Sequence, residues 1–417
     1  MIAKRKKGFV LITAYMVIVV LVILGAAFIS RAINETRIAQ RQNRSAKALY
    51  LAEAGIDFAL TQLRAGNPAG NNNAFLAQLG NYNCVWNRIG FTLTWEIVST
   101  GTVDNIQRIV RVELQPDTFA RYLYFTDDEH FRWNWWRLPV WFISGDYLGG
   151  PLQSNSHLHI SGDPVFADPN YHNAVKTVGD TIDYMHGGPP NDNPDFQEGI
   201  QLGVDPVPFP SQALDLRSAA ANGGYEFNAS GVNPAQIILH CDSTITVTDQ
   251  VRVSQNMALP ANGAVFVAGG DVQVSGALSG QLSIGGDSNI VVTDNVAYCD
   301  DPRINPESAD TLALIAERDV VVSSAAPYDL EINASILALG SSFVVEEWWE
   351  GPAKGTLTVY GGIIQDERGP VGTFDSDTNT RMSGYSKNYQ YDFRLLEDPP
   401  PFYPTTGDFV ILLWEEL

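Results

Sequence analysis

Positive charge is scarce in this sequence of 417 residues. It has 26 Lys and Arg against 47 Asp and Glu, for a formal net charge of −21. Residues 1–64 carry 10 of the basic and 3 of the acidic side chains, so the rest of the chain holds 16 basic against 44 acidic ones. Nucleic-acid binding needs a basic footprint, and attraction to an anionic membrane surface also needs basic charge. We therefore expect neither for residues 65–417.

Cysteine is also scarce. Cys84, Cys241 and Cys299 are the three in the chain, and none belongs to a C-x-x-C pair, which argues against a zinc site. In an oxidising compartment a Cys241–Cys299 disulfide is one alternative, and buried free thiols are the other. The odd count leaves at least one thiol unpaired.

Signals for catalysis and metal binding are weak. The G-x-S-x-G motif, which forms the nucleophile elbow of many serine hydrolases, is absent. His157 and His159 would share one strand face as a metal pair, but no third ligand is identifiable, so we expect surface histidines. Asp375 and Asp377 would suit calcium, although the spacing of an EF-hand is missing. We expect no catalytic residue, cofactor or metal ion.

What the chain does have is a long apolar segment, residues 9–29, without a single charge. Its length suits a helix that crosses the ~30 Å hydrocarbon core of a bilayer. Lys4-Arg5-Lys6-Lys7 and Gly8 precede it. Three interpretations compete: a secretory signal peptide cleaved near Gly25-Ala26-Ala27, a plain anchor with a cytoplasmic basic end, and a prepilin cut after Gly8.

The residues that follow favour the prepilin. No proline occurs between Phe9 and Arg64, and apolar residues recur at intervals of three and four from Leu49 to Leu63. A continuous helix over residues 9–64 is predicted, roughly 84 Å long at 1.5 Å per residue. A signal peptide would instead end in a loop. Residues 65–73, rich in Gly, Pro and Asn, end the predicted helix.

Residues 48–56 read ALYLAEAGI. With the basic leader and the apolar helix, residues 8–64 resemble the N-terminal region of PilX-type minor pilins. The resemblance implies cleavage between Gly8 and Phe9 by a prepilin peptidase, methylation of the new terminus, and insertion in the inner membrane before assembly. It also implies filament packing against other pilin-like subunits through Thr13, Leu49, Ala52, Glu53, Gly55 and Ile56.

Position five of the expected mature chain departs from major pilins, which usually carry Glu there. Here it is Thr13. In pilins that carboxylate is thought to pair with the N-terminal amine of a neighbouring subunit, and an unpaired carboxylate at bilayer depth is costly. The departure favours a minor or tip subunit over the main subunit of a fibre.

Beyond the helix, residues 65–117 predict a small antiparallel domain. Residues 91–98 and 107–114 alternate apolar and polar side chains, with turn residues at 99–105 between them. Residues 118–150 are rich in aromatic side chains, among them Trp133, Trp135 and Trp136. They suit either a platform that stacks on sugar rings or a core cluster that seals the end of the next domain.

Residues 118–417 predict a large all-β domain. Short strands flank Gly-Gly-Asp turns at 269–271 and 285–287, an offset of 16, and a similar turn contains Asp319. This pattern favours a right-handed parallel β-helix, with a β-sandwich as the alternative. Asp271, Asp287 and Asp319 would form a column that either acts on polysaccharide or closes turns. Residues 167–234 lack periodicity and are interpreted as a surface excursion.

Residues 361–373, 384–394 and 399–404 resemble the end of an uncharacterised domain found behind PilX-type N-termini. That resemblance implies a surface location without known catalysis, and Tyr, Asp and Arg side chains that hydrogen-bond the last strands. We therefore expect an α+β, minor pilin-like structural subunit of a type IV pilus or type II secretion filament, whose partners are the pilus assembly machinery and other pilin-like subunits. The alternative is a membrane-anchored β-helix adhesin or polysaccharide-acting enzyme outside any filament.

Overall fold

The chain folds into two compact units, Met1–Pro116 with Gly407–Leu417, and Asp117–Thr406. The computed structural model describes residues 7–77, 79–89, 94–167, 175–210, 213–230 and 233–417. The sequence assigned everything from residue 118 to residue 417 to the large domain. Residues 407–417 instead belong to the first unit, because the last strand adds to its sheet.

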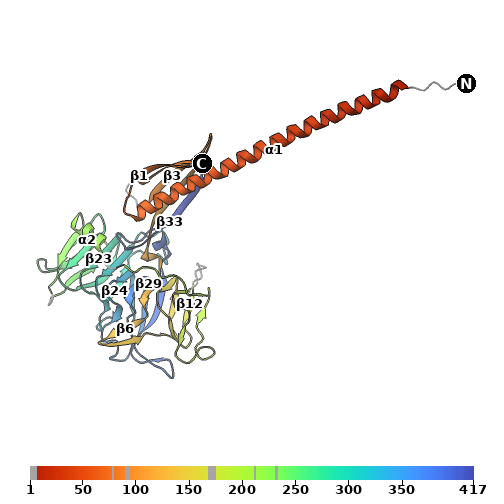
Figure 1. The fold of residues 1–417 in the computed structure, drawn as a ribbon. Helices are drawn as coiled ribbons and strands as arrows, with labels where there is room; N and C mark the ends of the chain where they lie inside the picture. The colour runs from red at the N-terminus through yellow and green to blue at the C-terminus, as the bar shows by residue number, and fades with distance from the viewer. Residues whose placement is uncertain (1–6, 78, 90–93, 168–174, 211–212, 231–232) are drawn as a thin grey trace. The chain divides into compact units, whose positions relative to one another are not determined.

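A single helix, α1 (Lys7–Arg64), forms the start of the first unit (Figure 1). No proline interrupts it, so the predicted helix over residues 9–64 is confirmed. Almost all side chains from Leu11 to Arg44 are exposed, although most of them are apolar as far as Ile29. The helix is long and apolar enough to cross a membrane. Residues 4–6 of the basic leader lie outside the described residues.

The last turns of α1 pack on an antiparallel sheet with the order β1-β2-β3-β4-β33. Its strands are β1 (Gly70–Leu76), β2 (Gly80–Arg88), β3 (Trp95–Val103), β4 (Ile106–Thr118) and β33 (Thr405–Glu416). The predicted turn at 99–105 is wrong in its extent, since residues 99–103 continue β3. The chain reverses at Asp104 and Asn105, where Asp104 has a φ of 53°. Residues 91–93 of the predicted strand lie outside the described residues.

Small residues let the helix and the sheet approach closely. A Cβ atom at Gly101 would collide with the backbone carbonyl oxygen of Ala48, and one at Gly55 would collide with the Ser99 hydroxyl. Polar and small residues at 99–102 resemble a turn in the sequence, but here their size serves packing. The core beneath α1 consists of Ala48, Leu51, Ala52, Ile56, Ala59, Leu63, Tyr82, Cys84, Trp86, Ile97, Val103, Val110, Val112 and Leu114.

We expect Gly101→Ala to lower the free energy of unfolding of the first unit by about 1–3 kcal/mol, the usual cost of overpacking. The obstacle is helix backbone, which cannot turn aside as a flexible side chain can. Ala46→Leu is the control, because it adds bulk to an exposed position of the same helix. Urea unfolding of the full chain in detergent, followed by hydrogen exchange of peptides from β3, measures the effect. Equal stability of both variants would contradict this close packing.

Most strands of the large unit pair in parallel ladders. The first ladder runs through β17 (Tyr225–Asn228), β21 (Ala264–Ala268), β23 (Gln281–Gly286), β25 (Thr311–Ala316), β27 (Leu330–Ala338), β29 (Ala353–Glu367), β5 (Tyr124–Asp128), β10 (Leu152–Ser154), β13 (Val175–Thr177) and β16 (Ile200–Leu202). The second runs through β18 (Ala235–Leu239), β22 (Val272–Leu278), β24 (Ile290–Tyr298), β26 (Val320–Val322) and β28 (Phe343–Val345).

Two shorter parallel ladders complete the unit. One joins the first half of β29 to β32 (Gly384–Tyr391), β9 (Tyr147–Gly149), β12 (Val165–Ala167) and β15 (Asp195–Phe196), and the other joins β8 (Phe142–Ile143), β11 (His159–Ser161) and β14 (Asp183–Tyr184). Hairpins and short helices add to them: β6 (His130–Trp133) with β7 (Trp136–Pro139), β19 (Thr244–Thr248) with β20 (Gln255–Ala258), β30 (Phe374–Asp375) with β31 (Thr380–Arg381), α2 (Leu214–Ala221), η1 (Phe119–Arg121) and η2 (Phe393–Leu396).

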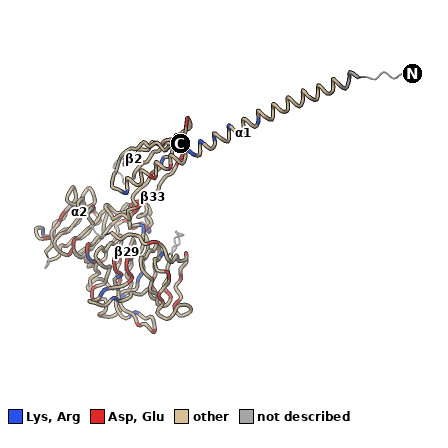
Figure 2. Tube along the Cα trace, viewed as in Figure 1, with Lys and Arg blue, Asp and Glu red and all other residues tan. Residues whose placement is uncertain are grey.

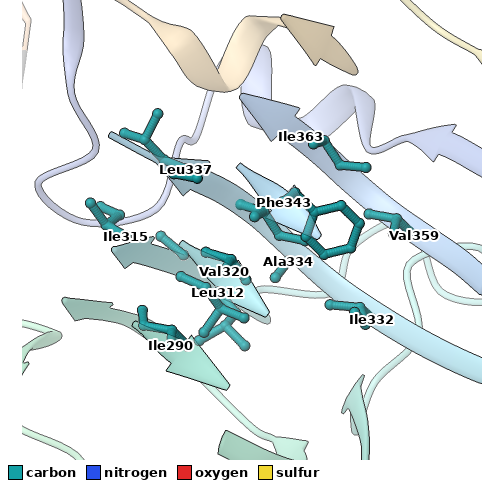
Figure 3. Packing of buried hydrophobic residues seen from close by; sticks show 14 of the residues in the cluster. Ile290, Leu312, Ile315, Val320, Ile332, Ala334, Leu337, Phe343, Val359 and Ile363 are labelled. Atoms are coloured by element: carbon teal, nitrogen blue, oxygen red, sulfur yellow. The ribbon is translucent and has the colours of Figure 1, made fainter. Parts of the chain in front are cut away.

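The expected fold class is therefore confirmed: a long N-terminal helix, an antiparallel sheet and a large, mostly β unit. Long parallel ladders are expected of a β-helix more than of a sandwich, so we favour the β-helix. Its right-handed coiling stays a prediction. Apolar side chains from successive strands stack into one core, as Ile290, Leu312, Ile332 and Val359 show (Figure 3).

The order of the ladders does not follow the order of the chain. Late strand β29 pairs with early strand β5, with Ile363 opposite Tyr124, and late strand β32 pairs with β9. We call these two pairings the seam. Residues 175–202 extend the ladders beyond the seam through β13 to β16, and β17 begins the first ladder. The predicted surface excursion over residues 167–234 is therefore wrong for both parts. Residues 168–174, 211–212 and 231–232 lie outside the described residues.

Candidate functional site

Buried charge gathers at the seam. Glu129 and Asp146 are fully buried, and they pair with three cations, Arg368, Arg381 and Lys387. We call these five residues the seam cluster. Nη1 of Arg368 lies 2.8 Å from Oε2 of Glu129, and its guanidinium carbon lies 3.5 Å from the centre of the Phe142 ring. Ion pairing and ring contact together tie β29 to the strand and hairpin that follow β5.

The backbone of Trp141 is held by the same cations. Its carbonyl oxygen accepts hydrogen bonds from Nη2 of Arg368 at 3.2 Å and from Nζ of Lys387 at 3.3 Å. Burial lowers the pKa of Lys387 to about 8, against the opposing effect of the Asp146 carboxylate. At neutral pH the lysine is therefore mostly protonated, and the cluster holds one more positive than negative charge.

A cavity of about 210 Å³ opens above this cluster. Aromatic side chains of Phe131, Trp141, Trp348 and Phe374 line it, together with Arg381 and Lys387. The remaining lining residues are Leu138, Pro139, Val140, Ile143, Pro370, Val371, Gly372 and Thr373. Apolar walls with a few convergent polar groups are typical of ligand sites. We call this cavity the seam pocket.

The aromatic wall of the pocket continues onto the surface. Trp133 lies 5.5 Å from Trp348 and stacks on Trp349 at 5.2 Å between ring centroids. The β6–β7 hairpin that carries Trp133 turns at Asn134, with φ of 56°, and Trp135, which is 87% exposed. Each of the two interpretations of residues 118–150 applies to a part of them. The core cluster includes Phe119, Tyr124, Phe125 and Phe142, whereas the tryptophans of the hairpin form an exposed surface.

His157 and His159, the predicted histidine pair, have different surroundings. His159 is buried, with Nδ1 3.2 Å from Asp183 and its ring 4.7 Å from that of His130, so the expectation of a surface position is wrong for it. Burial lowers its pKa to about 4, which keeps it neutral at pH 7. Among the described residues, no group of three His, Cys, Asp or Glu side chains is arranged to hold a metal ion.

Asp375 closes a turn: its Oδ1 accepts from the backbone N–H groups of Asp377 and Thr378. The predicted aspartate column differs from the observed one. Asp271, Asn289, Asp319 and Ser342 occupy equivalent positions on successive strands, while Asp287 lies apart and accepts from the Gly269 N–H. The repeat offset of 16 misassigned Asp287, because Gly286 is still within β23 and pairs with Val267.

Each side chain of this column bonds to the next strand. Oδ1 of Asp271 accepts from the Asn289 N–H at 3.1 Å, Oδ1 of Asn289 from the Asp319 N–H at 3.2 Å, and Oδ1 of Asp319 from the Ser342 N–H at 2.8 Å. The carboxylate oxygens of Asp271 and Asp319 and the amide oxygen of Asn289 thus accept hydrogen bonds from backbone N–H groups of neighbouring turns, which is a structural role.

The residues assigned to filament packing divide into two groups. Ala52, Gly55 and Ile56 are buried against this chain's own sheet, so they are not surface for a neighbouring subunit. Leu49 and Glu53 are partly exposed, and Thr13 is exposed on the apolar half of α1. Gly8 and Phe9 belong to the first turn of α1. The helical period identified the apolar face of α1 that becomes buried. It could not predict whether this chain's own sheet or a neighbouring subunit would cover that face.

Tyr and Arg side chains of the tail form hydrogen bonds, but their partners are η1 and the loops before β25 and β27 rather than the last strands. The Tyr391 hydroxyl donates to the carbonyl oxygen of Ala120, and the Tyr385 hydroxyl donates to that of Pro327. Arg394 pairs with Asp392 and donates to the carbonyl oxygens of Ser308 and Asp310. The seam cluster itself was missed, because its members, from Glu129 to Lys387, span most of the length of the unit Asp117–Thr406 and share no motif. The aromatic content of residues 118–150 was the only signal that pointed to this region.

A family model described as a domain of unknown function (DUF4900) matches residues 90–171. No curated protein matches. Among solved structures, the chain is similar to the competence-associated pilin ComZ from Thermus thermophilus, with 13% identity and a TM-score of 0.37, over 90% of this chain and 98% of that one.

Proposed function

We propose that this chain is a minor pilin-like structural subunit of a type IV pilus or type II secretion filament, with no catalytic activity of its own. The observation that carries the proposal is the continuity of α1. One helix joins the exposed apolar half, which fits a bilayer or a filament core, to a half that is buried under its own small sheet. A cleaved signal peptide would not need that continuity.

Charge supports export of the rest of the chain. In the sequence, basic side chains precede the apolar segment of α1. Figure 2 shows basic side chains after that segment on α1 and acidic side chains spread over the large unit. The basic leader would stay in the cytoplasm and the remainder would cross the inner membrane. In a filament the large unit would be displayed at the cell surface, and the disulfide of that unit fits an oxidising compartment.

Thr13 bears on the place of the subunit in the filament. Without a carboxylate there, the subunit cannot form the ion pair with a neighbour's N-terminal amine that would gain strength in a dry fibre core. We therefore place it in few copies near the tip. The alternative, an anchored β-helix adhesin or polysaccharide-acting enzyme outside any filament, shares the helix but needs no cleavage after Gly8.

We expect the mature chain to begin at Phe9 when it is produced together with a prepilin peptidase. Gly8 lies between the basic run and the apolar helix, where such a peptidase cuts. Intact-mass spectrometry of the purified protein measures the terminus, with a Gly8→Val variant as the uncleaved control. A chain that begins at Met1, or near Ala27, would contradict the prepilin interpretation.

Filament membership is tested with the same two variants. The cleaved chain should co-purify with sheared filaments and label at one or a few sites on each, while Gly8→Val should remain in the membrane fraction. Labels along the whole fibre would contradict the tip position, and equal amounts of both variants at the surface would favour the non-filament alternative.

A further inference from the structure

The seam cluster leaves hydrogen-bonding capacity directed at the pocket. Arg381 donates from Nε to the Ser386 hydroxyl and from Nη2 to Oδ1 of Asp146, and among the described residues no hydrogen bond from its Nη1 is found. The side chain of Arg381 also lines the pocket. Lys387 and Arg381 are both largely buried. The cluster has three cations and two carboxylates. An anion in the pocket would neutralise the excess positive charge and accept hydrogen bonds from the remaining N–H groups of these cations.

The volume and the lining of the seam pocket limit the kind of molecule to which this anionic group can belong. At about 210 Å³ the pocket is smaller than the roughly 300–1,000 Å³ of pockets for drug-sized ligands, so it holds about one ring. Trp141 and Trp348 offer apolar ring faces there. Outside it, Trp133 and the 45%-exposed Trp349 continue the aromatic wall in contact with water. A ligand with flat apolar faces and polar edges, repeated along a chain, fits both parts.

The charge of the surroundings excludes dense polyanions. Residues 65–417 hold 44 acidic and 16 basic side chains, which would repel nucleic acids and polymers charged at every unit. A glycan with an isolated carboxylate avoids that repulsion and still supplies the one negative charge that the cluster lacks.

We propose that the seam pocket binds a single uronic acid residue of an otherwise neutral glycan. Arg381 and Lys387 bind its carboxylate, Trp141 and Trp348 contact the pyranose ring, and Trp133 and Trp349 stack on the neighbouring neutral sugars. The site gives the displayed unit a ligand class, and it does not depend on assembly of the chain into a filament.

Titration calorimetry and tryptophan fluorescence of the full chain in detergent test this site. The probes are methyl glucuronide, methyl glucoside and a xylo-oligosaccharide with one glucuronate branch. We expect the glucuronide to bind at least tenfold more tightly than the glucoside, and the branched oligosaccharide to bind more tightly still. Arg381→Gln should weaken binding of both acidic probes at least tenfold, whereas Arg318→Gln, the same change at an exposed position of another surface, should leave both unchanged.

A second variant separates ring stacking from charge and guards against misfolding of the first. Trp349→Ala should weaken binding of the oligosaccharide several-fold and leave methyl glucuronide unchanged, and Trp414→Ala, at a similarly exposed tryptophan of the small sheet, should change neither. Equal binding of glucoside and glucuronide, equal binding of acetate or a peptide carboxylate, or no binding of the acidic probes would each overturn the proposal. Because the mature N-terminus is measured separately, failure here is distinguishable from failure of the pilin-like function.

Discussion

Replacing Glu129 by Leu is expected to lower the free energy of unfolding of the large unit by about 3–5 kcal/mol. The substitution leaves the guanidinium of Arg368 buried beside the remaining cations Arg381 and Lys387, with only Asp146 to balance three charges. The Thr126 hydroxyl, which donates to Glu129, also loses one of its two hydrogen-bond partners and keeps the Ser154 hydroxyl. Because Arg368 and Glu129 connect β29 with the segment after β5, the loss should open the seam first.

Denaturant unfolding of the full chain in detergent measures the total effect, and hydrogen exchange of peptides from β5 and β29 locates it. Arg318→Met is the control: Arg318 lies at an exposed position of the same unit, so the cost should be at most about 0.5 kcal/mol. The double variant Glu129→Leu with Arg368→Met should cost clearly less than the sum of the two single changes, because it removes both charges. Additive losses would show that the two residues act independently.

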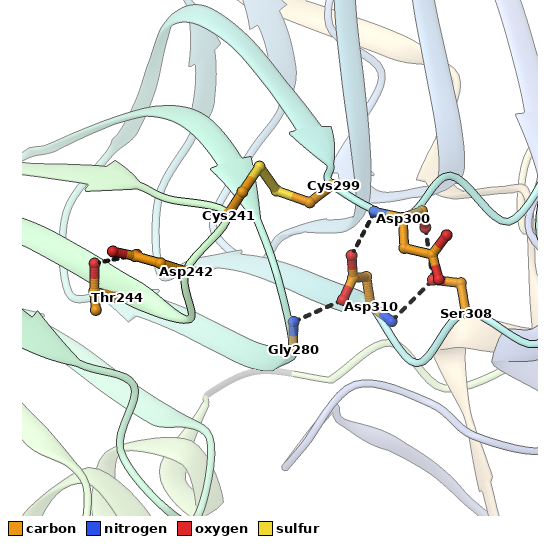
Figure 4. The surroundings of a disulfide bond; sticks show 8 residues. All are labelled: Cys241, Asp242, Thr244, Gly280, Cys299, Asp300, Ser308 and Asp310. Carbon is orange, nitrogen blue, oxygen red and sulfur yellow. Dashed lines mark hydrogen bonds between the residues drawn. A yellow bond between two sulfur atoms is a disulfide. The ribbon is translucent and has the colours of Figure 1, made fainter.

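Loss of the Cys241–Cys299 disulfide should also destabilise the large unit, by about 2–5 kcal/mol. The bond closes a loop with a sequence separation of 58 and joins the turn after β18 to the end of β24, two strands away in the second ladder (Figure 4). Beside it, Asp310 accepts hydrogen bonds from the backbone of Gly280 and Asp300 and orders the following loop. Without the disulfide, the unfolded chain between Cys241 and Cys299 can adopt more conformations, which favours unfolding.

The measurement compares the unfolding midpoints of the native chain and of the Cys241→Ser, Cys299→Ser double variant. Cys84→Ala is the control, since Cys84 is a free, buried thiol in the first unit and its removal should leave unfolding of the large unit unchanged. Thiol titration of the denatured native chain should find one free thiol before reduction and three after it. Three free thiols before reduction would show that Cys241 and Cys299 are not joined by a disulfide.

Local features of the chain could be predicted from the sequence because their causes are local. An uncharged apolar run followed by apolar residues at the helical period, with no proline in either, determines α1. Alternating apolar and polar residues determine β4, and a short apolar run determines β21. The choice between a disulfide and free thiols stayed open in the sequence, since it depends on the distance between Cys241 and Cys299. Only their placement two strands apart decides it.

The candidate site could not be predicted, because it depends on which strands become neighbours. Residues 124–129 and 363–368 pair across the seam although the chain between them contains nearly all the other strands of the unit. No periodicity in the sequence links these two segments. Several different strand orders would bury the same apolar faces, so the sequence does not select one of them. The sequence by itself determined the apolar helix, the acidic character of residues 65–417 and their strand-rich composition. The tertiary structure decided the partner of each strand, and with it the cluster of charges and tryptophans that forms the seam pocket, because such contacts depend on distance in space rather than along the chain.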